Sequence, residues 1–190
     1  MSAISDTLMI PILFVIGSIF GSFLNVVIYR VPKKMSIVKP GSHCFSCKKP
    51  ICFKDNIPIL GYFLLKGKCR HCSNPYPSRY AFVELITALL TICVYLIYGM
   101  GQPFIIYLSL TYLLIAITFV DIDHFIIPNG FVLIGLGVLA FGLYFGWIPI
   151  TWEDSLYGSL VFAGFLFSIG LIGQFILNKE KIFYRVDIKF

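Results

Sequence analysis

Charged residues are scarce in this sequence, and acidic residues are scarcer than basic ones. Asp, Glu, Lys and Arg make up 13% of its 190 residues, with nine Asp and Glu against fifteen Lys and Arg, while hydrophobic residues make up 58%. A soluble domain of this length cannot hide so much apolar surface, which excludes a single water-soluble globule. The sequence also lacks a Gly-rich phosphate loop or dinucleotide fingerprint, so its function must be sought in other motifs.

Long uncharged runs take the place of the missing charges. A helix needs about 20 apolar residues to cross a bilayer, and several runs approach or exceed that length. A Gly-Met-Gly-Gln-Pro break at 99–103 divides one of these runs into two. The runs predict an all-α, polytopic membrane protein with about five transmembrane helices, at residues 7–29, 82–98, 103–120, 129–147 and 155–177.

The basic residues are unevenly distributed, and their distribution predicts an orientation. Eleven of the fifteen Lys and Arg residues lie between Arg30 and Arg79, and the other four follow the last predicted helix. The predicted loops at 99–102 and 148–154 contain none. Because Lys and Arg near helix ends stay in the cytoplasm, we expect an inner (plasma) membrane protein with its N-terminus outside. This orientation puts three segments in the cytoplasm: loop 30–80, loop 121–128 and the C-terminal tail.

Membrane lipid is the simplest partner for these basic residues, because the inner leaflet carries anionic headgroups. A nucleic-acid site would more usually have aromatic residues interleaved with the basic ones for base stacking. We therefore expect no nucleic-acid partner.

Four of the six cysteines form two Cys-x-x-Cys pairs in loop 30–80, namely Cys44 with Cys47 and Cys69 with Cys72. Thiols remain reduced in the cytoplasm, which favours metal ligation over disulfides. Two pairs separated by 21 residues are typical of a structural zinc site with four thiolate ligands. Such a closed site has no open coordination position, so the zinc is expected to stabilise the loop. A redox-active dithiol, unligated thiols and a zinc-thiolate redox sensor are the alternatives.

The few acidic residues are the candidates for chemistry. Asp121 and Asp123 end the predicted third helix, and Asp187 follows the fifth on the same side. This topology allows Asp121 and Asp187 to approach each other. Two close carboxylates share a proton, so that one activates water while the other polarises a peptide carbonyl, as in aspartyl proteases. Acids at helix ends are also common without any catalytic role, and the sequence pattern alone leaves both interpretations open.

Some residues of the predicted helices and loop have structural interpretations. Gly17 and Gly21 have the Gly-x-x-x-Gly spacing that permits close helix packing in lipid. Asn25 follows near the end of the same helix, where it either bonds to a neighbouring helix or lines a substrate groove. Glu84 is interpreted as an acid that opens the second helix, where the macrodipole favours it. Cys52 is a weak alternative metal ligand.

A series of ordered motifs extends over nearly the whole chain. They are FGSFLNVVIYRVP at 20–32, both Cys-x-x-Cys pairs, DNIPILGY at 55–62, GKCRHC at 67–72, RYAFVEL at 79–85 and DIDHFIIPN at 121–129. Together they resemble the type IV prepilin peptidase family. The resemblance implies a membrane aspartyl protease that cleaves the leaders of type IV prepilins or pseudopilins at the cytoplasmic face. It also implies, for many members, methylation of the new N-terminus with S-adenosylmethionine.

The resemblance assigns roles to individual residues. It makes Asp121 and Asp187 the catalytic pair, and it implies zinc binding by the four paired cysteines. The second aspartate of the family belongs to a Gly-x-Gly-Asp motif, whereas Tyr184 and Val186 stand at the glycine positions here. An inactive or truncated family member, acting as a membrane scaffold in pilus or secretion assembly through its zinc loop, is therefore the alternative function.

The expected organisation follows from the helices and the resemblance. Family members usually continue through further membrane helices, so the last domain is expected to be incomplete. The expected domains are a first transmembrane helix (1–29), a cytoplasmic zinc-binding loop (30–80) and a membrane-embedded peptidase domain (81–190).

Overall fold

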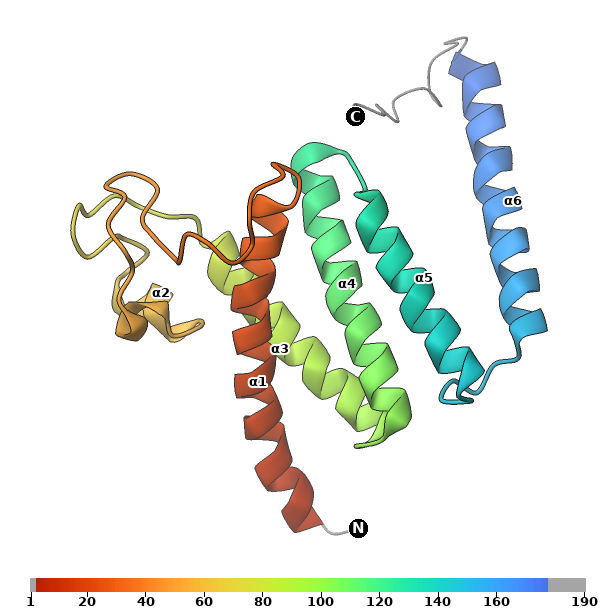
Figure 1. Ribbon diagram of the computed structural model, residues 1–190, viewed down its shortest axis with the longest axis horizontal. Coiled ribbons are helices and arrows are strands. Elements are labelled where there is room, and N and C mark those ends of the chain that lie inside the picture. Colours follow the sequence, from red (N-terminus) through yellow and green to blue (C-terminus); the bar gives the residue numbers. More distant parts are fainter. Residues whose placement is uncertain (1–2, 178–190) are drawn as a thin grey trace. The chain divides into compact units, whose positions relative to one another are not determined.

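The computed structural model describes residues 3–177, and the regular elements of this part of the chain are all helical. Figure 1 labels these helices along the chain, which divides into two compact units, Met1–Leu139 and Ala140–Phe190. In chain order the elements are α1 (Ala3–Arg30), the 3-10 turn η1 (Phe53–Asn56), α2 (Leu60–Leu64), α3 (Arg79–Tyr98), α4 (Gln102–His124), α5 (Asn129–Tyr144) and α6 (Trp152–Leu177).

A helix occupies each of the five positions where the sequence predicted one. Within the described residues, three of these helices contain spans that are long and apolar enough to cross a bilayer, with 24 residues in α1, 20 in α3 and 23 in α4. The helix α5 has 16 residues, fewer than predicted. It ends early because Gly146 takes a left-handed conformation with φ of +65°, and the Trp147 N–H turns back to the Gly142 carbonyl.

The end of α4 also differs from the prediction, because this helix continues through His124 and so includes Asp121. The next residue, Phe125, takes a left-handed conformation, and its N–H donates to the Asp121 carbonyl at 2.8 Å. This turn ends the helix. Asp121 and Asp123 are therefore residues of the last helical turn.

The helices of the first unit pack through small and polar residues as well as through apolar ones. A Cβ added to Gly17 would lie 2.7 Å from the Ala88 Cα, and one added to Gly21 would lie 2.7 Å from the Glu84 Cα. The predicted Gly-x-x-x-Gly spacing thus brings α1 close to the backbone of α3. Between α3 and α4, the Thr91 and Tyr112 hydroxyls form a hydrogen bond of 2.9 Å.

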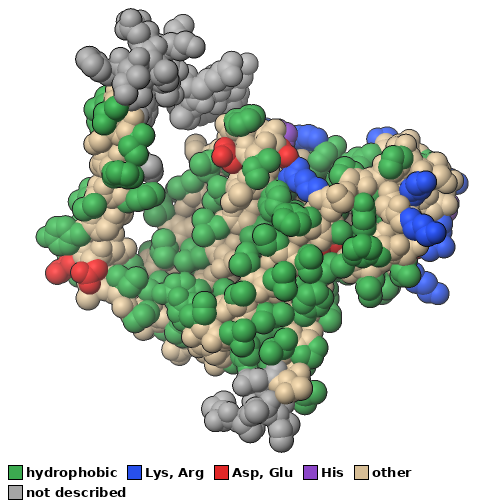
Figure 2. All heavy atoms as spheres, turned by 180° about the vertical axis from the view of Figure 1, so that it is seen from behind, with side chains coloured by type: hydrophobic (Ala, Val, Ile, Leu, Met, Phe, Trp, Pro, Cys, Tyr) green, Lys and Arg blue, Asp and Glu red, His purple; other side chains and the backbone are tan. Residues whose placement is uncertain are grey.

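Apolar side chains fill the space among α1, α3 and α4 near one end of the unit. This cluster consists of Leu24, Val27 and Ile28 from α1, Val83 from α3, Ile115, Ala116 and Val120 from α4, and Phe131 from α5. The helices also carry many exposed hydrophobic side chains, and Figure 2 shows these over the outer surface. Such a surface suits a lipid environment.

In the second unit, the start of α6 is fixed by a local cap. The Asp154 N–H donates to the Thr151 hydroxyl at 3.1 Å, and that hydroxyl donates to the Asp154 carboxylate at 2.6 Å. The Thr151 hydroxyl thus caps the helix N-terminus, and the Asp154 carboxylate in the first turn is also favoured by the macrodipole.

Candidate functional site

The cysteine loop (residues 31–78) joins α1 to α3 and contains two turns of the same design, one around each Cys-x-x-Cys pair. In the first turn the Cys44 N–H donates to the Lys49 carbonyl at 3.0 Å, and the Lys48 N–H donates to the Cys44 carbonyl at 2.9 Å. The second turn repeats these bonds from Cys69 to Asn74 and from Ser73 to Cys69, both at 2.9 Å. These bonds turn the thiols of each pair toward the same point.

The four paired thiols form one cluster whose dimensions fit a zinc ion. All four sulfur atoms lie within 4.8 Å of one another. The Cys44 and Cys72 sulfurs are 3.8 Å apart, and the Cys47 and Cys69 sulfurs are 3.9 Å apart. A tetrahedral zinc ion with Zn–S bonds of about 2.3 Å requires sulfur–sulfur separations of about 3.8 Å. Cys52, the weak alternative ligand, lies outside this cluster.

The backbone around the cluster favours ionised thiols at the first cysteine of each pair. The N–H of Cys47 is the largest cause that lowers the pKa of Cys44 to about 6. The N–H of Cys72 is likewise the largest cause that lowers the pKa of Cys69. At Cys72 the Asn74 N–H acts in the same direction, but desolvation and the neighbouring thiols outweigh it and raise the pKa to about 11. Because metals bind thiolates, a bound cation would favour ionisation of all four.

Two polar contacts hold the turns of the loop in place. The Arg70 guanidinium donates to both carboxylate oxygens of Asp55, at 2.7 and 2.5 Å, and this contact lowers the pKa of Asp55. The Asn74 amide donates to the Ser46 hydroxyl, which joins one cysteine turn to the other. The loop is thus cross-linked by polar side chains as well as by its thiol cluster.

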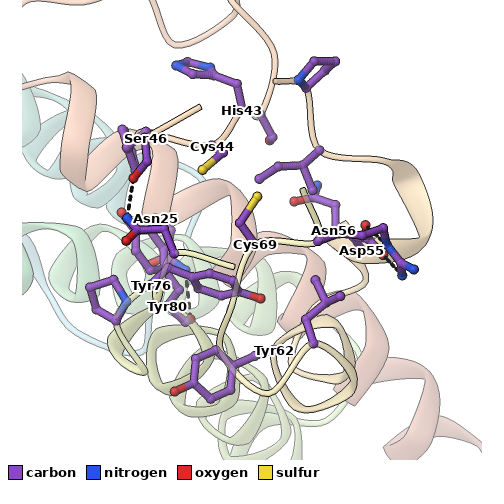
Figure 3. A pocket seen from close by; sticks show the side chains of 18 of the residues that line it. Asn25, His43, Cys44, Ser46, Asp55, Asn56, Tyr62, Cys69, Tyr76 and Tyr80 are labelled. Carbon is purple, nitrogen blue, oxygen red and sulfur yellow. Dashed lines mark hydrogen bonds and ion pairs between the residues drawn. The ribbon is translucent and has the colours of Figure 1, made fainter. Parts of the chain in front are cut away.

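A cavity of about 340 Å³ lies between the cysteine loop and the adjoining ends of α1 and α3. Figure 3 shows polar and aromatic side chains from these elements around it, including Asn25, Tyr62, Tyr76 and Tyr80. The volume is in the range of small-molecule sites, which are about 300–1,000 Å³. The cysteine cluster forms part of the wall, through Cys44 and Cys69.

Two polar residues at this cavity attach the loop and helices to one another. The Asn25 amide donates to the Tyr80 carbonyl at 3.0 Å, and Asn25 also lines the cavity, so both of its predicted roles agree with its position. Glu84 is buried, and its carboxylate accepts the Ile59 N–H of the loop at 2.7 Å. The interpretation of Glu84 as a helix-opening acid was wrong, because α3 begins at Arg79 and the carboxylate binds the loop instead.

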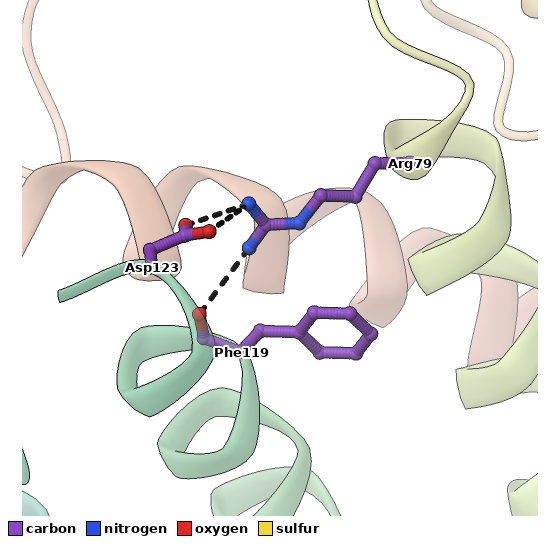
Figure 4. Close-up of polar contacts among 3 residues, drawn as sticks. All are labelled: Arg79, Phe119 and Asp123. Atoms are coloured by element: carbon purple, nitrogen blue, oxygen red, sulfur yellow. Dashed lines mark hydrogen bonds and ion pairs between the residues drawn. The ribbon is translucent and has the colours of Figure 1, made fainter. Parts of the chain in front are cut away.

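The acidic end of α4 is joined to the first residue of α3 (Figure 4). One guanidinium nitrogen of Arg79 donates to both carboxylate oxygens of Asp123, at 2.5 and 2.6 Å, and the other donates to the Phe119 carbonyl at 3.4 Å. The guanidinium also lies 5.1 Å from the centre of the Phe119 ring. Asp121, two residues before Asp123, is exposed in the same helical turn.

Of the two predicted catalytic aspartates, the structure describes only Asp121. Asp121 lies at the end of an apolar span, as predicted, whereas Asp187 lies outside the described residues. Sequence reasoning missed the contact between Arg79 and Asp123 and the burial of Glu84. The available signal was weak, since it consisted of opposite charges at the ends of two adjacent predicted helices.

The known proteins that this chain resembles carry closely related names. Residues 15–98 match the family described as Bacterial Peptidase A24 N-terminal domain. A "Type 4 prepilin-like proteins leader peptide-processing enzyme" of Escherichia coli O78:H11 (strain H10407 / ETEC) is 35% identical over 194 residues, covering 90% of this chain and 71% of that protein. No solved structure matches the chain.

Two further relatives are named prepilin leader peptidase/N-methyltransferase. The protein of Myxococcus xanthus (strain DK1622) is 39% identical over 154 residues, covering 81% of this chain and 45% of that protein. The protein of Aeromonas salmonicida (strain A449) is 32% identical over 199 residues, covering 91% of this chain and 68% of that protein. The chain therefore spans only part of the length of each of these relatives.

Proposed function

This chain belongs to the prepilin leader peptidase/N-methyltransferase family, and we propose that it cleaves the leader peptides of type IV prepilins or pseudopilins. The observation that carries this proposal is the position of Asp121, exposed in the last turn of α4 at the end of a span long enough to cross the bilayer. A prepilin has a polar leader followed by an apolar helix, so its scissile bond lies at the membrane boundary where we expect Asp121.

The proposed mechanism uses the carboxylates of Asp121 and Asp187 as an aspartyl pair. One carboxylate, ionised, takes a proton from the attacking water, and the other, protonated, donates a hydrogen bond to the scissile carbonyl. The pair shares one proton because two like charges at close range do not both ionise. The resemblance of the sequence to the family supports the choice of Asp187.

We further propose that the catalytic face and the cysteine loop are cytoplasmic, in a multi-pass protein of the inner membrane. The support is the distribution of charge, since eleven of the fifteen Lys and Arg residues lie between Arg30 and Arg79. Figure 2 shows basic side chains gathered over the cysteine loop. The domain organisation that goes with this proposal is a first transmembrane helix (1–29), the loop (30–80) and a peptidase domain (81–190).

A structural zinc ion held by the four paired cysteines belongs to the same proposal. Zinc would replace the missing apolar core of the loop, which has few buried residues of its own. The cluster would thereby fix the wall of the neighbouring cavity, to which Cys44 and Cys69 contribute.

Methylation of the new N-terminus is the second activity that we propose, from the names of the relatives and from the cavity. S-adenosylmethionine, when bound, supplies an electrophilic methyl group on a cationic sulfur. Tyrosine rings attract such cations, and Tyr29, Tyr62, Tyr76 and Tyr80 all contribute to the lining. These residues would hold the methyl donor.

The alternative function is a membrane scaffold without peptidase activity, which uses its cysteine loop to hold partners of pilus or secretion assembly. The observation in its favour is the replacement of the two expected glycines before Asp187 by Tyr184 and Val186. Both side chains restrict backbone conformations that glycine permits.

A cleavage assay in detergent or liposomes tests the peptidase proposal. We expect the parent chain to shorten a prepilin substrate, and we expect Asp121→Asn and Asp187→Asn each to reduce the rate by at least about a hundredfold. The matched control is Asp154→Asn, which removes a carboxylate from the α6 cap and should retain most of the activity. Cleavage by Asp121→Asn at the parental rate would refute the aspartyl mechanism.

Metal analysis of the same preparations separates an inactive enzyme from a misfolded one. We expect one zinc ion per chain in the parent and in Asp121→Asn, and a loss of zinc in Cys47→Ser but not in Cys93→Ser. Absence of cleavage by a folded, zinc-loaded parent chain would favour the scaffold. Absence of zinc from a folded, active parent would remove the zinc part of the proposal.

A further inference from the structure

The short helix α2 presents an apolar stripe on the outside of an otherwise basic loop. Leu60, Phe63 and Leu64 are 58%, 67% and 74% exposed, and they occupy positions i, i+3 and i+4 of one helical face. Phe53 of the adjoining turn η1 is 89% exposed. Water is an unfavourable environment for these side chains, so the stripe requires a covering partner.

The inner side of α2 is fixed against the loop, so the stripe cannot turn inward. Gly61 is buried, and a Cβ at this position would lie in contact with the Asp55 carbonyl oxygen. Tyr62 packs edge-on against Tyr76, with ring centres 5.5 Å apart, and its ring also contacts Gly67. The orientation of α2 is therefore determined by contacts on its polar side.

The depth of α2 follows from its attachment to a membrane-spanning helix. The carboxylate of Glu84 accepts the N–H of Ile59, the residue that precedes α2, at 2.7 Å. Glu84 lies five residues after Arg79, where the span of α3 begins, which corresponds to about 7.5 Å along the helix axis. In Figure 1, α2 lies alongside the C-terminal part of α1 rather than beyond its end. The part of the cysteine loop that contains α2 therefore lies at the level of the headgroup region of the bilayer, near the start of the α3 span.

The charges around the stripe fit a lipid surface better than a purely apolar partner. Lys54 follows Phe53, and Lys66 and Lys68 follow α2, and all three side chains are exposed. Long lysine side chains keep their ammonium groups at the headgroups while their stems cover apolar surface. Amphipathic helices with this arrangement lie about 5–10 Å into the boundary between headgroups and acyl chains, and anionic lipids attract their lysines.

We propose that α2 is an interfacial membrane anchor of the cysteine loop. Leu60, Phe63 and Leu64 insert among the outer acyl-chain segments of an anionic leaflet, and Lys54, Lys66 and Lys68 contact lipid phosphates. The anchor holds the outer wall of the cavity at the bilayer surface. This inference is independent of the peptidase mechanism, since it depends only on the span of α3 and the contacts of α2.

Fluorescence quenching in vesicles tests the anchor. The full chain is prepared with Trp147→Phe and Trp152→Phe, so that Phe63→Trp introduces a single indole into the stripe. The matched control is His71→Trp, at an exposed position between the cysteines of the second turn. We expect Phe63→Trp to emit at shorter wavelength and to be quenched more by lipids brominated near the headgroup than by lipids brominated near the chain end. We expect bromine to leave His71→Trp unquenched.

Either of two results would overturn the proposal. Equal, red-shifted and unquenched emission from both variants would mean that the stripe lies in water. Blue-shifted but unquenched emission from Phe63→Trp would mean that protein, rather than lipid, covers it. Circular dichroism and thermal unfolding of each variant verify that the fold is retained.

A charge reversal tests the role of the lysines. In the Phe63→Trp chain we expect Lys54→Glu with Lys66→Glu to weaken quenching in vesicles that contain anionic lipid and to leave it unchanged in zwitterionic vesicles. The same quenching in both kinds of vesicle, before and after the change, would exclude a contribution from anionic headgroups.

Discussion

At the scale of single residues, Arg79 joins the last turn of α4, which contains Asp121, to the start of α3. Its side chain reaches from the first turn of α3 to the last turn of α4, where it binds Asp123 and the Phe119 carbonyl. A cation near this carbonyl is also stabilised by the partial negative charge at the C-terminal end of the α4 dipole. Since Asp121 lies between these two partners in the same turn, we propose that Arg79 is a positioning residue for the proposed reaction.

We therefore predict that Arg79→Ala lowers kcat for leader cleavage by about tenfold or more while KM changes little, because a displaced catalytic group slows the chemical step. Thermal stability should change little, since a partly exposed ion pair contributes about 0–1 kcal/mol. The control is Arg70→Ala, which removes the ion pair between Arg70 and Asp55 and should leave kcat unchanged.

A double variant distinguishes positioning from catalysis. If Arg79 and Asp123 act together, Arg79→Ala combined with Asp123→Asn should be no slower than the slower single variant. Additive losses, with Asp123→Asn much slower than Arg79→Ala, would instead make Asp123 a reacting group.

At the scale of elements, the close approach of α1 to α3 rests on two glycines. A Cβ at Gly21 would lie 2.7 Å from the Cα of Glu84, which is a backbone atom and cannot move without its helix. Because Glu84 also carries the hydrogen bond to Ile59, separating the two helices would shift the attachment of the cysteine loop. Packing of this kind is typical of helices in lipid.

We predict that Gly21→Ala destabilises the protein by about 1–3 kcal/mol, the usual cost of overpacking. For a chain of this size the melting temperature should fall by about 2–4 °C for each kcal/mol. The control is Gly137→Ala in α5, where an added Cβ meets nothing within 4 Å and the melting temperature should hold or rise slightly. Thermal unfolding in one detergent compares both with the parent, and equal melting temperatures for parent and Gly21→Ala would contradict the close packing.

Helix ends were the part of each element that the sequence predicted least well. Apolar runs predicted all five helices because the length of each run can be read directly from the sequence. The end of α5 depends instead on the left-handed Gly146, and the end of α4 on a left-handed Phe125, a residue type with no preference for that conformation. Hydropathy carries no information about either turn.

At the scale of the whole molecule, the cluster of four cysteines was predictable and the cavity beside it was not. Cys-x-x-Cys spacing determines local turn geometry, so Cys44, Cys47, Cys69 and Cys72 could be grouped from the sequence. The cavity forms only where the loop folds back onto α1 and α3, through contacts such as Ile59 with Glu84 across 25 positions. Long-range contacts of that kind leave no periodic pattern in a single sequence.

The number of membrane crossings determines whether the proposed catalytic pair can form at all. Asp121 precedes α5 and Asp187 follows α6 in the sequence, so the two residues lie on opposite sides of the membrane if only one of these helices crosses it. With 16 residues, α5 is about 24 Å long, less than the hydrocarbon thickness of about 30 Å. The uncharged residues on both sides of α5, such as Ile126, Ile127 and Trp147, extend the apolar segment, and local bilayer thinning would accommodate the remaining mismatch if α5 crosses.

We predict that alkaline phosphatase, which is active only outside the cytoplasm, is active when fused after Gly101 or Gly146. It should be inactive when fused after Lys39 or Phe125, with green fluorescent protein giving the opposite pattern. The fusion after Gly146 is decisive, because its activity depends on the crossing by α5. If that fusion is inactive while α6 still crosses, Asp187 lies on the opposite side from Asp121. The aspartyl pair would then be impossible, although the cysteine loop, the cavity and the α2 anchor would be unaffected.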